Sequence, residues 1–322
     1  MDSHLPDALR AALNALLEGK ARAPLVERAA KISDCYRDGE SSGVAITSPD
    51  DVLAYLLARL PATYAAVAAV LSEVQARCDV APKTLGDVGA GPGTASWAAT
   101  QIWPSLAGVT MIDSSAGFLQ MARTLAARGP SAALSGATTT LADMTRLPAL
   151  QSDLVIVSYA LAELPEAALR DVVANLWASC TGVLILVEPG TSAGYRRILA
   201  CRSALIAAGA KVVAPCPHAM PCPVVAPDWC HFSQRLPRSR DHMIVKSANV
   251  PFEDEKFSYL AVARDHVAIV PYGARVLAPP KKDKTGIALR VCADGAIAQR
   301  KIASRDRTEF SRYRDIRWGD GI

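Results

Sequence analysis

Between residues 83 and 208, short apolar runs alternate with longer segments of helical spacing, and this alternation limits the fold more than any other feature of the sequence. The apolar runs cover residues 84–91, 108–115, 153–161 and 182–190. Helices are expected from Ala95, from Phe118 to Ala127, from Glu166 to Ala178 and from about Ala193 to Ala208. Buried strands that alternate with amphipathic helices are typical of a parallel, doubly wound sheet. The sequence therefore predicts an α/β fold.

A glycine-rich turn follows the first predicted strand. Gly89, Gly91 and Gly93 lie between this strand and a helix, where glycine lets the backbone turn sharply and approach a ligand closely. The spacing is GxGxG with Pro92 inside it, and it lacks the GxGxxG pattern of pyrophosphate binders. We therefore favour S-adenosylmethionine as the ligand, with a dinucleotide as the competitor.

Two acidic positions extend the predicted cofactor site. Asp113 ends the second predicted strand, where a carboxylate accepts hydrogen bonds from ribose hydroxyls in S-adenosylmethionine and NAD sites alike. Asp143 and Met144 follow the next predicted strand, where methyltransferases place an acid for the adenine amino group and an apolar neighbour for the ring. The candidate cofactor-binding residues are Asp87, Gly89, Ala90, Gly91, Gly93, Thr94, Asp113, Ser114, Asp143, Met144 and Tyr159. The alternative is a turn that merely joins strand to helix.

The methyl-acceptor side of this site has no recognisable motif. Ser158, Tyr159 and Glu163 follow the fourth predicted strand, from which methyltransferases supply catalytic groups, and Glu188 and Pro189 close the fifth. No Asn-Pro-Pro-Tyr motif and no Cys-Pro pair is present there. We therefore assign no catalytic base, and whether the chain is an enzyme stays open.

Three of the eight cysteines lie in a short loop that is rich in proline: Cys216, Cys222 and Cys230. The loop has little means of folding around a core of its own, and a metal would supply the missing stability. Three thiolates from one loop and a distant fourth suit an iron-sulfur cluster or a structural zinc, and we choose Cys292 as the fourth ligand. Softness does not separate the two metals, because thiolates suit both.

Other residues compete with or stand apart from this cysteine set. His218 and His231 are rival fourth ligands and would give a Cys3His zinc site. The remaining alternative is that the loop cysteines are ordinary buried thiols. The other four, which have no partners in sequence, are expected to be small core residues: Cys35, Cys78, Cys180 and Cys201.

The sequence divides into three parts. Residues 1–80 form a helical region, in which Ser48 and Pro49 mark the start of a helix. Residues 81–264 hold the α/β domain, with a cysteine-rich, metal-binding insertion over 215–255 between the strands at 211–215 and 256–264. Residues 265–322 form a basic β extension, where a hairpin is expected to turn at Asp294 and Gly295.

Charge is distributed unevenly along the chain. Before Lys211, 16 Lys+Arg face 19 Asp+Glu, which gives −3, whereas from Lys211 onward 19 face 12, which gives +7. A basic part of this kind suits a polyanion, most often nucleic acid, although a solvated basic surface without a partner is the alternative. The expected phosphate-binding residues are Arg235, Arg238, Arg240, Lys246, Lys281, Lys282, Lys284, Arg300 and Lys301.

Location is predicted from two negative features. No uninterrupted apolar run approaches the roughly 20 residues that a spanning helix needs. The first ten residues have neither a signal peptide's apolar stretch nor a transit peptide's acid-free, arginine-rich character. We expect a bacterial cytoplasmic protein without a membrane partner, and a monomer.

Four segments together resemble a known family: LLARLPATYAAV, DVGAGPGTASWA, the CPHAMPCP and WCHFSQR run, and KFSYLAVAR. They are similar to the methyltransferase-like family that assembles the mitochondrial ribosomal small subunit, and to its bacterial relatives. The match runs from about Asp51 to Cys292, and the cysteine run is its most specific part. The resemblance implies a class I, Rossmann-like methyltransferase fold with a [4Fe-4S] cluster on Cys216, Cys222, Cys230 and Cys292.

The resemblance also implies a function in translation. The leading hypothesis is an S-adenosylmethionine-dependent, methyltransferase-like protein that acts on or binds the RNA of the ribosomal small subunit during assembly, with a structural cluster. The first alternative is a non-catalytic RNA-binding assembly factor on the same fold. The second is a small-molecule methyltransferase with a structural zinc site.

Overall fold

A central sheet carries the architecture of the computed structural model, which describes residues 4–38 and 46–322. Its strands run in the order β3-β2-β1-β4-β5-β8-β6, and β7 pairs with β8. The first five strands are parallel, while β8 is antiparallel to β5, β6 and β7. The strands are β1 (Thr84–Val88), β2 (Gly108–Asp113), β3 (Thr138–Leu141), β4 (Ser152–Ser158), β5 (Cys180–Pro189), β6 (Lys211–Ala214), β7 (Phe232–Pro237) and β8 (Phe252–Ala263).

This strand order confirms the predicted α/β, Rossmann-like methyltransferase fold. The order reverses between β1 and β4, which is the switch point where open α/β sheets bind ligands. The antiparallel strand β8 lies between β5 and β6. Class I methyltransferase sheets end in such a pair, in which the antiparallel strand is followed by a last strand at the edge. Predicted and observed helix ends in this region agree within three residues.

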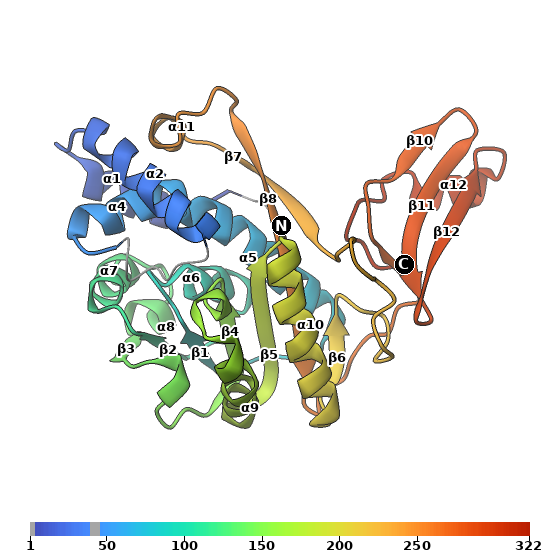
Figure 1. The fold of residues 1–322 in the computed structure, drawn as a ribbon, viewed down its shortest axis with the longest axis horizontal. Coiled ribbons are helices and arrows are strands. Elements are labelled where there is room, and N and C mark those ends of the chain that lie inside the picture. The colour runs from blue at the N-terminus through green and yellow to red at the C-terminus, as the bar shows by residue number, and fades with distance from the viewer. Residues whose placement is uncertain (1–3, 39–45) are drawn as a thin grey trace.

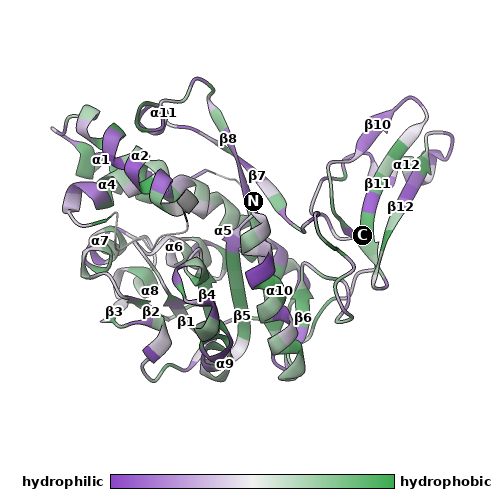
Figure 2. Cartoon of the chain, viewed as in Figure 1, coloured by the Kyte–Doolittle hydropathy of each residue, from purple (hydrophilic) through white to green (hydrophobic). Residues whose placement is uncertain are grey.

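Helices cover both faces of the sheet because successive strand residues point to opposite sides (Figure 1). Ile156 packs in the core shared with α5 and α6, while Val155 and Val157 pack in the core shared with α9 and α10. In Figure 2 the buried β5 is largely green, the colour of hydrophobic residues. The sheet helices are α6 (Thr94–Ile102), α7 (Ala116–Ala126), α8 (Ala132–Ser135), α9 (Leu169–Ser179) and α10 (Ser192–Ala207), with short 3-10 turns η1 (Met144–Arg146), η2 (Leu161–Glu163) and η3 (Glu166–Ala168).

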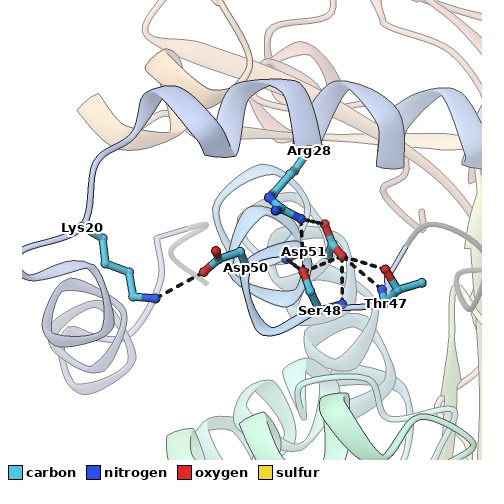
Figure 3. Close-up of polar contacts among 6 residues, drawn as sticks. All are labelled: Lys20, Arg28, Thr47, Ser48, Asp50 and Asp51. Atoms are coloured by element: carbon cyan, nitrogen blue, oxygen red, sulfur yellow. Dashed lines mark hydrogen bonds and ion pairs between the residues drawn. The ribbon is translucent and has the colours of Figure 1, made fainter.

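The N-terminal helices are α1 (Asp7–Leu17), α2 (Ala23–Asp38), α4 (Pro49–Ala58) and α5 (Leu60–Arg77). The predicted helix start at Pro49 is confirmed, because Ser48 caps α4 and Asp51 returns a bond to the cap backbone. Arg28 of α2 and the Thr47 backbone also donate to the Asp51 carboxylate (Figure 3). Burial acts to raise the pKa of Asp51, but the hydrogen bonds from Ser48 and Arg28 outweigh it and hold the pKa at about 2.

Helices α4 and α5 are rich in apolar residues. In residues 4–38 and 46–322, no individual helix has both the length and the apolar composition to cross a bilayer. The pair α4 and α5 meets these criteria only when its two helices, bent by 52°, are taken together.

An arm formed by β7, α11 (Arg240–Val245) and the first half of β8 extends from the main sheet over the N-terminal helices (Figure 1). Here the predicted boundary is wrong, because the insertion was expected to continue as far as residue 255. Residues 232–237 pair with 252–257, so the last strand is longer than its apolar run and carries charged residues at its exposed end. A strand recognised by apolar composition alone is therefore cut short where one end leaves the core.

A second, four-stranded sheet follows, and its core is separate from that of the main sheet. Its elements are β9 (Arg275–Val276), β10 (Lys281–Asp283), β11 (Gly286–Ala293), β12 (Ala296–Ala303) and α12 (Arg307–Tyr313). The predicted hairpin is confirmed, since β11 and β12 pair around Asp294 and Gly295, which have φ values of 47° and 73°. The division of the chain into three domains stays a prediction, with the boundaries at 1–80, 81–264 and 265–322.

Candidate functional site

A cavity of about 290 Å³ opens at the carboxyl ends of β1, β2 and β4, at the predicted cofactor site. The turn after β1 and residues from β2, η1 and β4 form its floor, and helices α4, α5 and α7 contribute its roof. We call this cavity the cofactor pocket. Its lining residues are Tyr55, Thr63, Val88, Gly89, Ala90, Gly91, Pro92, Thr94, Ile112, Asp113, Ser114, Phe118, Ala142, Asp143, Met144, Ser158, Tyr159, Ala160, Glu163 and Leu164.

Two glycines of the turn are required for different reasons. Gly89 has φ +68°, and a Cβ there would lie 2.4 Å from the Cβ of Ala160, so no other residue fits without displacing the chain. Gly91 has φ +53°, and a Cβ there would meet no atom within 4 Å. The Gly91 α carbon therefore borders open space, which leaves room for a ligand against the backbone.

Asp113 orders the same turn from the end of β2. Its carboxylate accepts the Gly91 N–H at 2.7 Å and the Ser115 N–H at 2.8 Å. Burial raises the pKa of Asp113, while these backbone hydrogen bonds act to lower it. An ionised carboxylate offers about four lone pairs, more than these backbone groups use, so Asp113 can still accept a hydrogen bond from a ribose hydroxyl.

Asp143 and Met144 both line the pocket. The Oδ1 atom of Asp143 accepts the N–H and the hydroxyl of Thr145, each at 2.7 Å. These bonds hold the pKa of Asp143 below its usual value. The exposed carboxylate keeps its second oxygen for a donor such as an exocyclic amine.

Two of the predicted cofactor-binding residues lie behind the pocket and do not line it. Asp87 is fully buried, and its Oδ2 accepts the N–H of Ser96 at 3.0 Å and the hydroxyl at 2.7 Å. Burial raises the pKa of Asp87 to about 6. Gly93, with φ +82°, starts α6. Both residues contact α6 and not the cavity: Asp87 accepts hydrogen bonds from Ser96, and Gly93 is the N-cap residue of this helix.

Tyr159 occupies the acceptor side in a strained conformation. Its φ is 58°, which residues with a side chain seldom adopt, and it follows directly after β4. Its hydroxyl donates to Oε1 of Glu255 on β8 at 2.9 Å, and Arg59 pairs with the same carboxylate at 3.3 Å. Of these three residues only Tyr159 lines the pocket, and Glu255 and Arg59, which do not line it, fix its hydroxyl.

The other acceptor-side candidates separate in the structure. Ser158 and Glu163 line the pocket, whereas Glu188 is fully buried and pairs with Arg197 at 2.7 Å. Burial raises the pKa of Glu188 to about 7, against the opposing effect of Arg197. Glu188 therefore stabilises the end of β5 through its ion pair with Arg197 and does not line the pocket.

Sequence reasoning missed the roof of the pocket. Tyr55, Thr63 and Phe118 line it from α4, α5 and α7, and the Tyr55 and Phe118 rings meet edge to face with centroids 5.0 Å apart. These residues read as ordinary apolar helix positions, and no local motif distinguishes them. Only the packing of the N-terminal helices over the sheet brings them to the cavity.

Three of the four predicted ligand cysteines line a second, small cavity, and the fourth lies near them. Cys216, Cys222 and Cys230 line it. Cys292 of β11 is close enough that burial together with the charges of Cys216 and Cys222 raises the pKa of its thiol to about 11. Burial and the other three sulfurs likewise raise the pKa of Cys230 well above its ordinary value. We call these four residues the cysteine site.

The surroundings of the cysteine site are polar at a few points. The Tyr195 hydroxyl lies 3.2 Å from the Cys222 sulfur, and Nε2 of His218 lies 3.3 Å from the Cys292 sulfur. His218 is thus a neighbour of Cys292. His231 stacks on Trp229 instead, with centroids 5.2 Å apart.

The sulfurs do not form a closed ligand shell. Within residues 4–38 and 46–322, no group of three or more His, Cys, Asp or Glu side chains has the arrangement needed to hold a metal ion. The other four cysteines, Cys35, Cys78, Cys180 and Cys201, are buried in the apolar cores, which confirms the prediction for them.

The nine predicted phosphate-binding residues divide between two elements. On the arm, Arg235 forms two 2.7 Å bonds with Asp254, and Arg238 and Lys246 both pair with Glu253. The second sheet keeps exposed lysines, and Lys281 and Lys301 flank Ala288 across three adjacent strands. Arg300 of the second sheet also pairs with Glu309, at 2.8 Å, so carboxylates neutralise part of the basic set on both elements, and the exposed Lys281 and Lys301 carry it on the second sheet.

Comparison with known proteins identifies relatives. The model of the family described as "Rsm22: Mitochondrial small ribosomal subunit Rsm22" matches residues 49–322, more than half of the chain. The human protein named ribosome assembly protein METTL17, mitochondrial, is 33% identical over 288 residues, which cover 83% of this chain and 61% of that protein. Rsm22-cox11 tandem protein 2, mitochondrial, of Schizosaccharomyces pombe is 27% identical over 333 residues, which cover 87% and 44%. The chain thus spans only about half of each relative's length.

Two solved structures illustrate the likeness in fold. Magnesium protoporphyrin IX methyltransferase of Synechocystis with bound S-adenosylmethionine has a TM-score of 0.41 at 16% identity, over 72% of this chain and 90% of that one. The ribosomal protein L11 methylase of Lactobacillus delbrueckii has 0.38 at 16%, over 62% and 78%. Because both scores are below 0.5, they add nothing to what the strand order shows.

The relatives contradict one expectation. A bacterial cytoplasmic location was predicted, but the family description and the names of the human and yeast relatives are mitochondrial. The prediction had relied on the composition of the first ten residues, and that reasoning was wrong.

Proposed function

Since the chain belongs to the Rsm22 family of the mitochondrial small ribosomal subunit, we propose that it is an S-adenosylmethionine-binding assembly factor of the small ribosomal subunit with a metal at its cysteine site. The observation that carries the first part is the cofactor pocket at the switch point of the sheet, with Gly91 bordering open space and Asp113 fixing the turn. A glycine turn and an acid at the end of the second strand are what a nucleoside ligand needs.

Calorimetric titration with S-adenosylmethionine tests this part. We expect binding that Asp113→Asn weakens at least tenfold, because the amide replaces the charged acceptor of the ribose hydroxyls. Asp153→Asn is the matched control, because this carboxylate caps the N–H groups of Lys83 and Thr84 at the opposite end of β1. Tight binding of NAD with no binding of S-adenosylmethionine would contradict the assignment.

Methyl transfer itself is the less supported half of the proposal. Tyr159 lines the acceptor side, but its hydroxyl already donates to Glu255, and Arg59 neutralises that carboxylate. A neutralised carboxylate is a poor proton acceptor. This favours the non-catalytic assembly factor, and transfer of a labelled methyl group to small-subunit particles would decide for the enzyme.

The cysteine site is proposed to hold a [4Fe-4S] cluster, with zinc as the alternative. Three half-buried cysteines that line one cavity, with the buried Cys292 near them, are a soft donor set that suits either group. When bound, the cluster would link the loop to β11, because the fourth cysteine, Cys292, lies on that strand. Arg290 of β11 pairs with Asp228 of the loop and supports the same connection.

Anaerobic purification with iron, sulfide and zinc analysis tests the metal. We expect about four irons and four sulfides per chain in wild type, with the loss of both in Cys222→Ser. Cys201→Ser is the control, because that thiol is buried in the core of the main sheet. One zinc and no iron would replace the cluster by the alternative, and the absence of metal would remove this part of the proposal.

RNA binding is proposed for the second sheet. Lys281 and Lys301 are exposed and stand on one face, on either side of a small residue, so a phosphate backbone can approach closely. Replacing both by glutamine should weaken binding to small-subunit ribosomal RNA and lower the slope of log affinity against log salt by about 2. Arg235→Gln is the control, because Asp254 already neutralises Arg235. Equal slopes in all three proteins would exclude this surface.

A further inference from the structure

Arg202 of α10 is a buried cation without a buried anion to match it. Its side chain is 4% exposed, and within the described chain it has no carboxylate at ion-pair distance. One nitrogen donates to the carbonyl oxygens of His218 and Met220, each at 2.8 Å, while Nε is buried and has no partner there. A buried guanidinium left without a counter-charge costs several kcal/mol, so such an arrangement needs an anion nearby.

The nearest chemistry that could supply this anion is the cysteine site. Arg202 lines the same small cavity as Cys216, Cys222 and Cys230. Neutral thiols do not compensate a guanidinium, whereas thiolates that ligate a metal carry net negative charge. Arg275, the second buried arginine near these sulfurs, is already neutralised by Glu73 at 2.7 Å and does not share this need.

Tyr195 reaches the site from the same helix. It precedes Arg202 by seven residues, which is close to two helical turns, so both side chains project from one face of α10. Ile198 and Leu199 lie between them and line the same cavity. The hydroxyl of Tyr195 is 3.2 Å from the Cys222 sulfur, within reach to donate a hydrogen bond to it.

We infer that Arg202 and Tyr195 are positioning residues that stabilise the negative charge of the metal-bound cysteine site, Arg202 through its guanidinium and Tyr195 through a hydrogen bond to Cys222. The inference rests on the metal that the proposed function assigns to these cysteines. Charge and hydrogen bonds at cluster sulfurs set the reduction potential, because each reduction adds negative charge to a site that is kept from water. Both residues therefore favour the reduced state.

The test compares full-length chains that are reconstituted anaerobically with iron and sulfide. Iron per chain is measured first, and then the midpoint potential by optical redox titration. The variants are Arg202→Gln, which removes the charge, Arg202→Lys, which keeps it, and Tyr195→Phe, which removes only the hydroxyl. Arg196→Gln is the control, because Arg196 is an exposed residue of the same helix.

We expect the midpoint potential to shift to more negative values in Arg202→Gln and by a smaller amount in Tyr195→Phe. Arg202→Lys should lie closer to wild type, and Arg196→Gln should equal it. Arg202 also holds two loop carbonyls, so if Arg202→Gln does not load iron, Tyr195→Phe decides alone. Potentials in Tyr195→Phe and Arg202→Gln that equal those of wild type would overturn the inference while leaving the cluster in place.

A wild-type chain that takes up no iron would overturn the proposed cluster and move the test to zinc. Zinc affinity, measured by competition with a chromophoric chelator, should then fall at least tenfold in Arg202→Gln and less in Tyr195→Phe. Unchanged zinc affinity in both variants would overturn the inference, and a wild type that binds neither metal would overturn it together with the metal site.

Discussion

The cofactor pocket takes its residues from the ends of β1, β2 and β4, whereas the cysteine site takes three of its sulfurs from a loop and the fourth from β11 of the second sheet. In the pocket, buried strands fix the turn, and Asp113 already holds Gly91 in place. In the cysteine site, the described side chains do not close into a metal shell, and Arg202 lacks a counter-charge. The cofactor pocket is formed by the protein alone, whereas we propose that the cysteine site depends on a metal for order and charge balance.

Removal of the ligand should therefore have different consequences at the two sites. A ligand that binds a preformed pocket adds stability in proportion to its concentration and affinity. A metal that organises a loop contributes folding free energy directly, so the proposed metal should stabilise the loop that carries the cysteines.

The largest effect is expected at the loop that carries three of the cysteines. Chelation of wild type, or Cys222→Ser, should speed amide hydrogen exchange over residues 216–231 about a thousandfold, or about 4 kcal/mol, because the loop loses its cross-link to β11. Exchange in β4 and β5 should stay unchanged, since these strands lie in the main core. If chelation accelerated β4 equally, the contrast between the two sites would fail.

A second effect is expected in the pocket, at Gly89. Gly89→Ala should cost about 3 kcal/mol in urea unfolding, because the new Cβ would collide with Ala160 and φ is positive. Gly209 also has a positive φ, +82°, but has open space around it, so Gly209→Ala should cost only about 1 kcal/mol. Equal costs at the two positions would mean that the turn can shift, and that the pocket is less preformed than the structure indicates.

Gly91→Ala separates stability from binding. It has the positive φ of Gly209 without the collision of Gly89, so its unfolding cost should match that of Gly209→Ala. Its Cβ would enter space that borders the pocket, and S-adenosylmethionine affinity should fall at least tenfold. Unchanged affinity would indicate that the ligand does not approach this part of the turn.

How far the sequence predicts these two sites follows from the range of the interactions involved. The turn after β1 was predictable because its glycines, Asp113 and the alternating strands are local patterns. Asp87 was assigned to the ligand by the same local pattern, but α6 takes up its carboxylate through Ser96. Arg59 and Glu255 are 196 residues apart, and no sequence pattern connects them.

The arm and the second sheet show the same limit. The first part of β8 was not recognised from the sequence, because residues 253–255 are charged. Its pairing with β7 depends on backbone hydrogen bonds and not on apolar composition. The nine basic residues were predictable as a set, but not their neutralisation, because Arg235 and Asp254 meet only when those strands pair. Cys292 was chosen as the fourth ligand before any resemblance was considered, and the family resemblance implies the same residue, although His218 and His231 competed with it in the sequence.

The next effect concerns the roof of the pocket, which the N-terminal helices supply. The folded-state pKa of Asp51 is about 2, below its ordinary value of 3.8, so its ionised form stabilises the fold. This contribution, about 2 kcal/mol, is complete above about pH 5 and is lost as the pH falls through 4 toward 2. Asp51→Asn should remove most of it at neutral pH, which chemical unfolding at pH 7 and pH 3 would measure.

The same variant connects the roof to the ligand. Tyr55 lies on α4, whose first turn Asp51 holds, so Asp51→Asn should also weaken S-adenosylmethionine binding by a few fold. Asp50→Asn is the matched control, because Asp50 lies beside Asp51 and is half exposed in its pair with Lys20 (Figure 3). A pH dependence equal in the two variants would show that the capping carboxylate does not stabilise the roof.

The smallest effect is expected at Tyr159, on the acceptor side of the pocket. Tyr159→Phe removes the 2.9 Å hydrogen bond to Glu255 but keeps the ring, and Arg59 still neutralises the carboxylate. The cost in urea unfolding should be about 1 kcal/mol, and S-adenosylmethionine affinity should stay within threefold of wild type, since the hydroxyl is already engaged by the protein. An affinity loss as large as that of Asp113→Asn would mean that Tyr159 turns from Glu255 to the ligand on binding. The pocket would then rearrange around its ligand as the cysteine site is expected to do, and the distinction between a preformed and a ligand-organised site would hold only for the glycine turn.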